Sequence, residues 1–230
     1  MSLQSAWTLI LPVKQTAIAK SRLHDLPGPV RQRLALAFAQ DAVSAAMRCP
    51  EVRRVVVVTN DPGWRQLADL GAEIVADLPD AGLNPALEHA AGLVRRRDPG
   101  ASVAAMSADL PAVRAVDLSA AFSSAPAARW FVSDRSGEGT TLLAAAAPAG
   151  LAPSFGTSSR AAHHASGAEE VDNGRLERLR LDVDTSIDLE LAVELGVGVF
   201  TAAALAANRL PGALDASSPS RYRFRSSPPA

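Results

Sequence analysis

The chain has 230 residues, 48% of them hydrophobic and 20% charged, with a formal net charge of −1 at pH 7. The length and apolar content suit one globular domain with a sizeable core, and the near-neutral charge excludes a global field that would recruit nucleic acid or an anionic membrane. The single cysteine, Cys49, excludes an intramolecular disulfide and a cysteine-built metal site. We expect a cytoplasmic protein, since the sequence shows no signal-peptide pattern and no apolar run long enough to cross a membrane.

The first half of the chain alternates strand and helix patterns. Apolar or β-branched runs predict four strands, at 7–13, 55–59, 71–77 and 101–106. Three helices are predicted between them, over 30–47, beginning near Pro62, and over 85–97. This alternation is typical of a parallel sheet with right-handed crossovers.

The pattern changes in the second half. Strands are predicted at 129–133 and 140–144, joined by the glycine-rich turn 136–139, and again at 179–183. Residues 155–159 indicate a loop that opens a helix, and Asp184 or Thr185 is expected to cap a final helix. We predict a single domain over 1–210 and a disordered Ser/Pro/Arg-rich tail over 211–230.

Three cations follow the first predicted strand, Lys14, Lys20 and Arg22. The carboxyl edge of an open α/β sheet is where ligands bind, so cations at this edge favour a polyphosphate. Solvated surface charge is the ordinary alternative for such residues. The chain contains neither a Walker-type phosphate loop nor a GxGxxG sequence, so the commonest nucleotide motifs are absent.

Carboxylates follow two further predicted strands. Asp109 comes directly after the strand at 101–106, and Asp182 and Asp184 are two residues apart, so in an extended segment they face the same side. Oxygen ligands of this kind suit Mg²⁺ bridging nucleotide phosphates. A turn aspartate at Asp109 and a helix cap at Asp184 are the alternatives.

The loop at 155–159 offers a second group of polar residues. Gly156, Ser158 and Ser159 precede a predicted helix, where backbone N–H groups and hydroxyls could meet a phosphate, although a plain helix cap is the simpler interpretation. His163 and His164 lie a few residues further and are expected at the surface. Cys49 precedes Pro50 and has no evident catalytic partner, so no nucleophilic triad is predicted.

These motifs together resemble the phosphoenolpyruvate/2-phospho-L-lactate guanylyltransferases of coenzyme F420 biosynthesis. The resemblance runs in order over residues 7–205. The segments that carry it are Pro12–Lys14, Ala19–Leu23, Gly82–Asn84, Asp109–Pro111, Gly137–Thr140, Phe155–Ser159 and Asp182–Thr185. It implies an α/β fold, a Rossmann-like three-layer αβα architecture with a mostly parallel mixed sheet, as in nucleotide-diphospho-sugar transferases.

The resemblance also implies a role for individual residues. Lys14, Lys20 and Arg22 would hold the triphosphate of GTP and, with Asp109, would be catalytic. The nucleotide would be bound by Pro12, Lys14, Asn60, Asp77 and Asn84, and Mg²⁺ by Asp109 with Asp182 or Asp184. Thr140, Gly156 and Ser159 would bind the phosphorylated three-carbon acid. Ala108 departs from the glycine usual before this Asp-Leu-Pro motif, which is tolerable if its backbone is not left-handed.

The implied reaction transfers GMP from GTP to the acid's phosphate and releases pyrophosphate. Phosphoenolpyruvate, 2-phospho-L-lactate and 3-phosphoglycerate all fit this description. The Ala/Arg-rich composition is more typical of a bacterial than of an archaeal protein, and on that ground we favour phosphoenolpyruvate. Two alternatives stay open: a nucleotidyltransferase of the same fold acting on a sugar phosphate or molybdopterin, and a GTP-binding regulatory module without turnover. The sequence leaves the oligomeric state open, a homodimer included.

Overall fold

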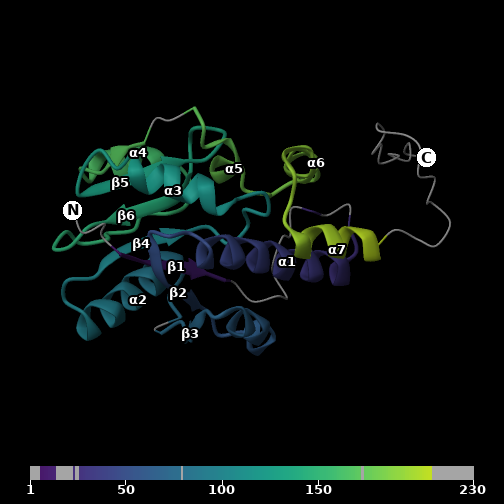
Figure 1. Cartoon of the computed structure of the whole chain (residues 1–230), viewed down its shortest axis with the longest axis horizontal. Coiled ribbons are helices and arrows are strands. Elements are labelled where there is room, and N and C mark those ends of the chain that lie inside the picture. The colour runs from purple at the N-terminus through teal and green to yellow at the C-terminus, as the bar shows by residue number, and fades with distance from the viewer. Residues whose placement is uncertain (1–5, 14–22, 24–25, 79, 172–173, 209–230) are drawn as a thin grey trace.

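The computed structural model describes residues 6–13, 23, 26–78, 80–171 and 174–208. Within this part the chain forms one sheet with strand order β3-β2-β1-β4-β6-β5-β7 (Figure 1). The strands are β1 (Trp7–Pro12), β2 (Val52–Val58), β3 (Glu73–Val75), β4 (Ser102–Met106), β5 (Arg129–Ser133), β6 (Thr140–Ala145) and β7 (Glu169–Glu170). Only β6 runs antiparallel to its neighbours. The predicted mostly parallel mixed sheet is therefore confirmed.

Helices cover both faces of this sheet. The elements are α1 (Gly28–Met47), the 3₁₀ helix η2 (Pro62–Leu70), α2 (Leu83–Arg97), α3 (Ala115–Ser123), α4 (Ser159–Ala165), α5 (Glu177–Arg180), α6 (Ser186–Leu195) and α7 (Val199–Ala207). Because side chains alternate along a strand, β1 sends Leu9 and Leu11 to the core under α1, η2, α3 and α5, and Ile10 to the core under α2. The result is the expected three-layer arrangement.

A third apolar cluster packs against α1. Leu34 and Phe38 on α1 pack there with Leu181, Val183 and Leu189 from the segment that leads into α6. Thr185 is the N-cap of α6 and forms a reciprocal capping box with Asp188. This packing anchors the segment that carries Asp182 and Asp184 beside the main sheet.

The structure corrects one predicted strand. Residues 179–183 form no strand: the short helix α5 ends at Arg180, and the extended residues beyond it join no sheet. The alternation of Leu179, Leu181 and Val183 arises because these side chains are buried in two successive clusters. The helices α3 and α7 and the short strand β7 were not predicted, and α6 is not the final helix.

The domain boundaries stay a prediction, since the proposed tail at 211–230 lies outside the described residues. Among the residues described, no helix combines the length and the apolar character that crossing a membrane requires.

Candidate active site

A cavity of about 1110 Å³ opens where β1 and β4 end. Pro12 lines it from the end of β1 and Val13 from just beyond, and Ser107, Ala108 and Asp109 line it from the loop after β4. The carboxyl edge of the parallel strands is the ligand-binding edge of an open α/β sheet. The volume lies near the upper end of the range usual for ligand pockets, about 300–1,000 Å³.

Three of the predicted aspartates meet at this cavity. Asp109, Asp182 and Asp184 all line it, although Asp182 and Asp184 lie more than 70 residues beyond Asp109 in the chain. The backbone N–H of Val183 donates a hydrogen bond to the carbonyl oxygen of Asp109 over 3.0 Å, which holds the two segments together. The expectation that Asp182 and Asp184 face the same side is therefore confirmed, even though the segment is not a strand.

The aspartates repel one another. Burial, followed by the charges of Asp109 and Asp184, raises the pKa of the Asp182 carboxyl to about 7. A carboxylate with this pKa is costly to ionise in the free protein, and a bound cation would relieve that cost. Such a strongly perturbed group in a cleft is typical of a functional site.

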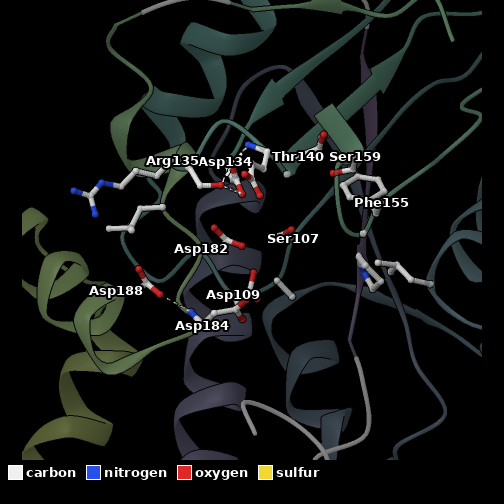
Figure 2. Close-up of a pocket in the computed structure, with 18 of the residues that line it drawn as sticks. Ser107, Asp109, Asp134, Arg135, Thr140, Phe155, Ser159, Asp182, Asp184 and Asp188 are labelled. Atoms are coloured by element: carbon white, nitrogen blue, oxygen red, sulfur yellow. Dashed lines mark hydrogen bonds between the residues drawn. The ribbon is translucent and has the colours of Figure 1, made fainter. Parts of the chain in front are cut away.

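The opposite side of the cavity carries hydroxyls. In Figure 2, Thr140, Phe155 and Ser159 are drawn across the cavity from Asp184 and Asp188. The Ser159 Oγ is buried and has no hydrogen-bond partner among the described residues. Because buried polar atoms are almost always hydrogen-bonded, this hydroxyl is a candidate ligand contact.

Backbone N–H groups at the end of the loop at 155–159 already donate hydrogen bonds within the protein. The Ser159 N–H donates to the Gly156 carbonyl oxygen over 3.1 Å, and the Arg160 N–H donates to the Glu138 carbonyl oxygen over 3.0 Å. These two N–H groups are engaged within the protein, so the Ser159 side chain is the better placed donor. Gly156 has a φ of 131°, a conformation that favours glycine.

His163 is the site residue that sequence reasoning missed. We expected both histidines at the surface, but His163 is fully buried, whereas the His164 side chain is 48% exposed. The Nδ1 of His163 lies 2.9 Å from Thr140 Oγ1, and its Nε2 accepts the Ser154 N–H over 3.0 Å. Two adjacent histidines on a short helix give no sequence signal of which one points inward.

Two asparagines expected near the nucleoside are held by the backbone of distant residues. Asn84 donates to the Phe155 carbonyl oxygen over 3.0 Å and accepts the Phe155 N–H over 2.8 Å. Asn60 makes the same reciprocal pair with the backbone of Asp77, at 2.8 and 2.9 Å. None of Asn60, Asp77 and Asn84 is among the residues that line the cavity. Their contact with a nucleotide stays a prediction.

The glycine-rich turn is organised by Asp134. Its carboxylate accepts hydrogen bonds from the Ser136 hydroxyl and from the Glu138 N–H, and it lies against Gly139, where a Cβ would be only 2.6 Å from Oδ2. Asp134, Ser136, Glu138 and Gly139 all line the cavity beside Thr140. The turn therefore forms one wall of the site.

The remaining predicted residues divide into two groups. Lys14, Lys20 and Arg22 lie outside the described residues, so their expected role stays a prediction. Ala108 lies in the cavity wall and is not among the described non-glycine residues with positive φ, which are Asp80, Ala152 and Ser158. The methyl group of Ala108 is therefore compatible with the backbone at this departure from the expected glycine.

The sheet order and the cavity at its carboxyl edge define an open, doubly covered α/β fold with a ligand-binding edge. A solved structure from Desulfovibrio desulfuricans G20, described as a candidate nucleotide-diphospho-sugar transferase, superposes with a TM-score of 0.61 at 17% sequence identity. The match covers 89% of this chain and 95% of that one. This likeness shows the fold.

Sequence similarity defines the family. The family model described as "Guanylyl transferase CofC like" matches residues 7–198. The phosphoenolpyruvate guanylyltransferase of Streptomyces avermitilis is 53% identical over 209 residues, covering 90% of this chain and 97% of its own. That of Thermomonospora curvata is 51% identical, covering 89% and 90%. The chain therefore belongs to the CofC-like guanylyl transferase family.

Proposed function

We propose that this chain transfers GMP from GTP to the phosphate of phosphoenolpyruvate and releases pyrophosphate, as a step of coenzyme F420 biosynthesis. Relatives with about half of their residues identical carry the name phosphoenolpyruvate guanylyltransferase. The single observation that carries the proposal is the cavity itself, which has Asp109, Asp182 and Asp184 on one side and the Thr140 and Ser159 hydroxyls on the other (Figure 2). These two sides suit a nucleotide–metal complex and a small anionic acid.

The chemistry requires positioning rather than a general base. An oxygen of the acid's phosphate attacks the α-phosphorus of GTP, the bond between the α-phosphorus and the bridging oxygen breaks, and pyrophosphate leaves with that oxygen. A phosphate dianion is already nucleophilic, so the site must chiefly hold two polyanions together and in line. His163 is buried between Thr140 and Ser154, in keeping with a reaction in which no histidine takes a proton.

Mg²⁺ fits the aspartate side of the cavity. Within the described residues, no three His, Cys, Asp or Glu side chains form a group that could hold a metal alone. Mg²⁺ is usually bound by one or two carboxylates together with substrate phosphates and waters. Burial, followed by the charges of Asp109 and Asp184, raises the pKa of Asp182, and a cation bound here would favour its ionised form. Asp109 and Asp182 or Asp184 would hold the ion, which when bound would neutralise charge on the triphosphate.

The predicted cations complete the proposed site. Lys14, Lys20 and Arg22 follow β1, whose last residue, Pro12, lines the cavity. We propose that they bind the triphosphate and neutralise the departing pyrophosphate. The proposed protein is a cytoplasmic enzyme, and light scattering on the purified chain decides between a monomer and a homodimer.

Pyrophosphate release tests the function directly. The purified chain is supplied with Mg²⁺, GTP and either phosphoenolpyruvate, 2-phospho-L-lactate or 3-phosphoglycerate, with ATP in place of GTP as the control. Release that requires GTP and is fastest with phosphoenolpyruvate is the expected result. Release with another acid only would reassign the substrate, and GTP binding without release with any acid would favour a sugar-phosphate transferase or a regulatory module.

A further inference from the structure

His163 lies between the two parts of the site that face the proposed acid. It is on α4, its Nδ1 reaches Thr140 at the start of β6, and its Nε2 reaches the backbone of Ser154 at the start of the loop that contains Gly156 and Ser159. The His163 ring also packs against Phe155, with ring centroids 5.4 Å apart and planes nearly perpendicular. One side chain therefore sets the spacing between a strand and a loop that both line the cavity.

The hydrogen bonds of His163 determine which of its nitrogens carries the proton. A backbone N–H can only donate, so the Nε2 that meets Ser154 must be unprotonated. Burial, with a smaller contribution from the Arg129 charge, lowers the pKa of His163 to about 4, so the ring is neutral at pH 7. A neutral ring that is unprotonated at Nε2 carries its proton on Nδ1.

The protonated Nδ1 in turn determines the direction of the Thr140 hydroxyl. Nδ1–H donates to Thr140 Oγ1 over 2.9 Å, so the hydroxyl must direct its own proton elsewhere. Within the part of the chain that the structure describes, the only hydrogen bond of Thr140 Oγ1 is the one to His163. Thr140 lines the cavity, so its proton is available to an acceptor there.

We propose that His163 is a positioning residue that accepts the Ser154 N–H, donates to Thr140 and so fixes the Thr140 hydroxyl as a donor to an anionic oxygen of the substrate. This inference rests on the proposed function, which places the phosphorylated acid beside Thr140. The fixed donor favours a phosphate or carboxylate oxygen, which accepts only, over a group that must donate. His163 itself touches no substrate in this arrangement.

Two isosteric variants separate the two hydrogen bonds of His163. His163→Asn keeps a donor near the position of Nδ1, whereas His163→Gln keeps an acceptor near Nε2 and loses the donor to Thr140. We expect His163→Gln to raise KM for the acid about tenfold and His163→Asn to stay within about threefold of wild type. KM for GTP should stay within about twofold in both variants, with thermal unfolding as the check that each variant folds.

A double variant tests whether His163 acts through Thr140. Thr140→Val removes the hydroxyl, keeps the shape, and should raise KM for the acid about as much as His163→Gln. The pair Thr140→Val/His163→Gln should then be no worse than Thr140→Val alone. Three outcomes would overturn the proposal and indicate a merely structural histidine. The rises in KM for the acid could multiply in the double variant, or His163→Asn and His163→Gln could raise that KM equally. KM for GTP could also rise as much as KM for the acid.

The proton arrangement can be measured without turnover. Nitrogen-15 NMR of the wild-type chain at pH 7 should show His163 as the neutral ring protonated at Nδ1. The opposite tautomer, or a charged ring, would overturn the inference. Wild-type protein that releases no pyrophosphate with any acid would instead defeat the proposed function, so the two failures are distinguishable.

Discussion

The backbone N–H of Val183 donates to the carbonyl oxygen of Asp109 over 3.0 Å, and this hydrogen bond joins the two segments that supply the aspartates of the site. Val183 is itself fully buried in the cluster formed with α1 and α6. The position of Asp182 and Asp184 beside Asp109 is therefore fixed by core packing and by the backbone. Substitution of the carboxylates should consequently change the chemistry of the site more than its fold.

Asp109→Ala should abolish turnover while the protein stays folded. Asp109 is a proposed ligand of Mg²⁺, and loss of a charge-stabilising group at a reacting centre costs on the order of 100-fold or more in kcat. Pyrophosphate release measures the activity, and calorimetry measures binding of Mg²⁺ with GTP. Asp69→Ala is the matched control, because Asp69 is an exposed aspartate on η2, and this variant should keep full activity. A folded, active Asp109→Ala would refute the metal assignment.

Asp182→Asn should stabilise the cation-free protein, and more so at high pH. The folded-state pKa of about 7 lies above the ordinary value of 3.8, so folding retains a proton between these values and wild-type stability is lost as pH rises through about 7. Asparagine carries no charge and removes this loss. Thermal unfolding at pH 5 and pH 8 without divalent ions should show a gain of a few degrees in Tm at pH 8 and a smaller one at pH 5. Equal gains at both pH values would contradict the raised pKa.

Most strands of the sheet and the helices between them were predictable, because the apolar pattern that marks each element lies within that element. The run Val55–Val58 is β-branched and fully buried, as both-face burial in a parallel sheet requires. The helix α3 was missed, as was α7, whose residues are nearly all apolar and therefore show no polar face. The predicted strand at 179–183 failed because alternating burial does not distinguish strand pairing from packing in two clusters.

The site was partly predictable for the same reason. Asp109 follows the buried strand β4, and this places it at the sheet edge. Asp182 also lines the cavity, but its predicted strand was wrong, and core packing with the hydrogen bond between Val183 and Asp109 positions it instead. The burial of His163 could not be predicted, because it depends on contacts outside its own helix. Thr140 is 23 residues away in the chain, and Ser154 is 9 residues away in the preceding loop. The pairing of Asn84 with Phe155, 71 residues away, likewise depends on how α2 meets the loop.

Ser159→Ala should raise KM for the acid without destabilising the protein. The buried Oγ has no partner in the described part of the chain, so its removal relieves a desolvation cost in the free protein. The same hydroxyl is a proposed ligand contact, so the acid should bind about tenfold less tightly in the variant. Denaturant unfolding and the two KM values measure these effects. A large loss of stability or an unchanged KM for the acid would each argue against this assignment.

Gly198→Ala should destabilise the fold by about 1–3 kcal/mol. Asp41 on α1 accepts the N–H groups of Phe200 and Thr201 at the start of α7, over 3.1 and 2.9 Å, and a Cβ at Gly198 would overlap the Asp41 carboxylate. Denaturant unfolding measures the loss. Gly150→Ala is the control, since a Cβ there meets nothing within 4 Å, and it should change stability by less than about 0.5 kcal/mol.

Asn84→Ala and Asn60→Ala should separate the two substrates. Each asparagine side chain makes two hydrogen bonds to the backbone of one residue that is distant in sequence. Asn84 holds Phe155, in the loop proposed to bind the acid. Asn60 holds Asp77, on the side proposed to bind the nucleoside. Because two hydrogen bonds are lost in each case, a comparable loss of local order is expected.

The two KM values distinguish these sides. Asn84→Ala should raise KM for the acid several-fold more than KM for GTP, although the resemblance implied a nucleotide contact for Asn84, and Asn60→Ala should do the reverse. Steady-state kinetics with each substrate varied in turn provides the measurement, with thermal unfolding as the check on folding. If Asn84→Ala chiefly raised KM for GTP, the side chain would instead act at the nucleoside, and its bonds to Phe155 would serve to hold it there.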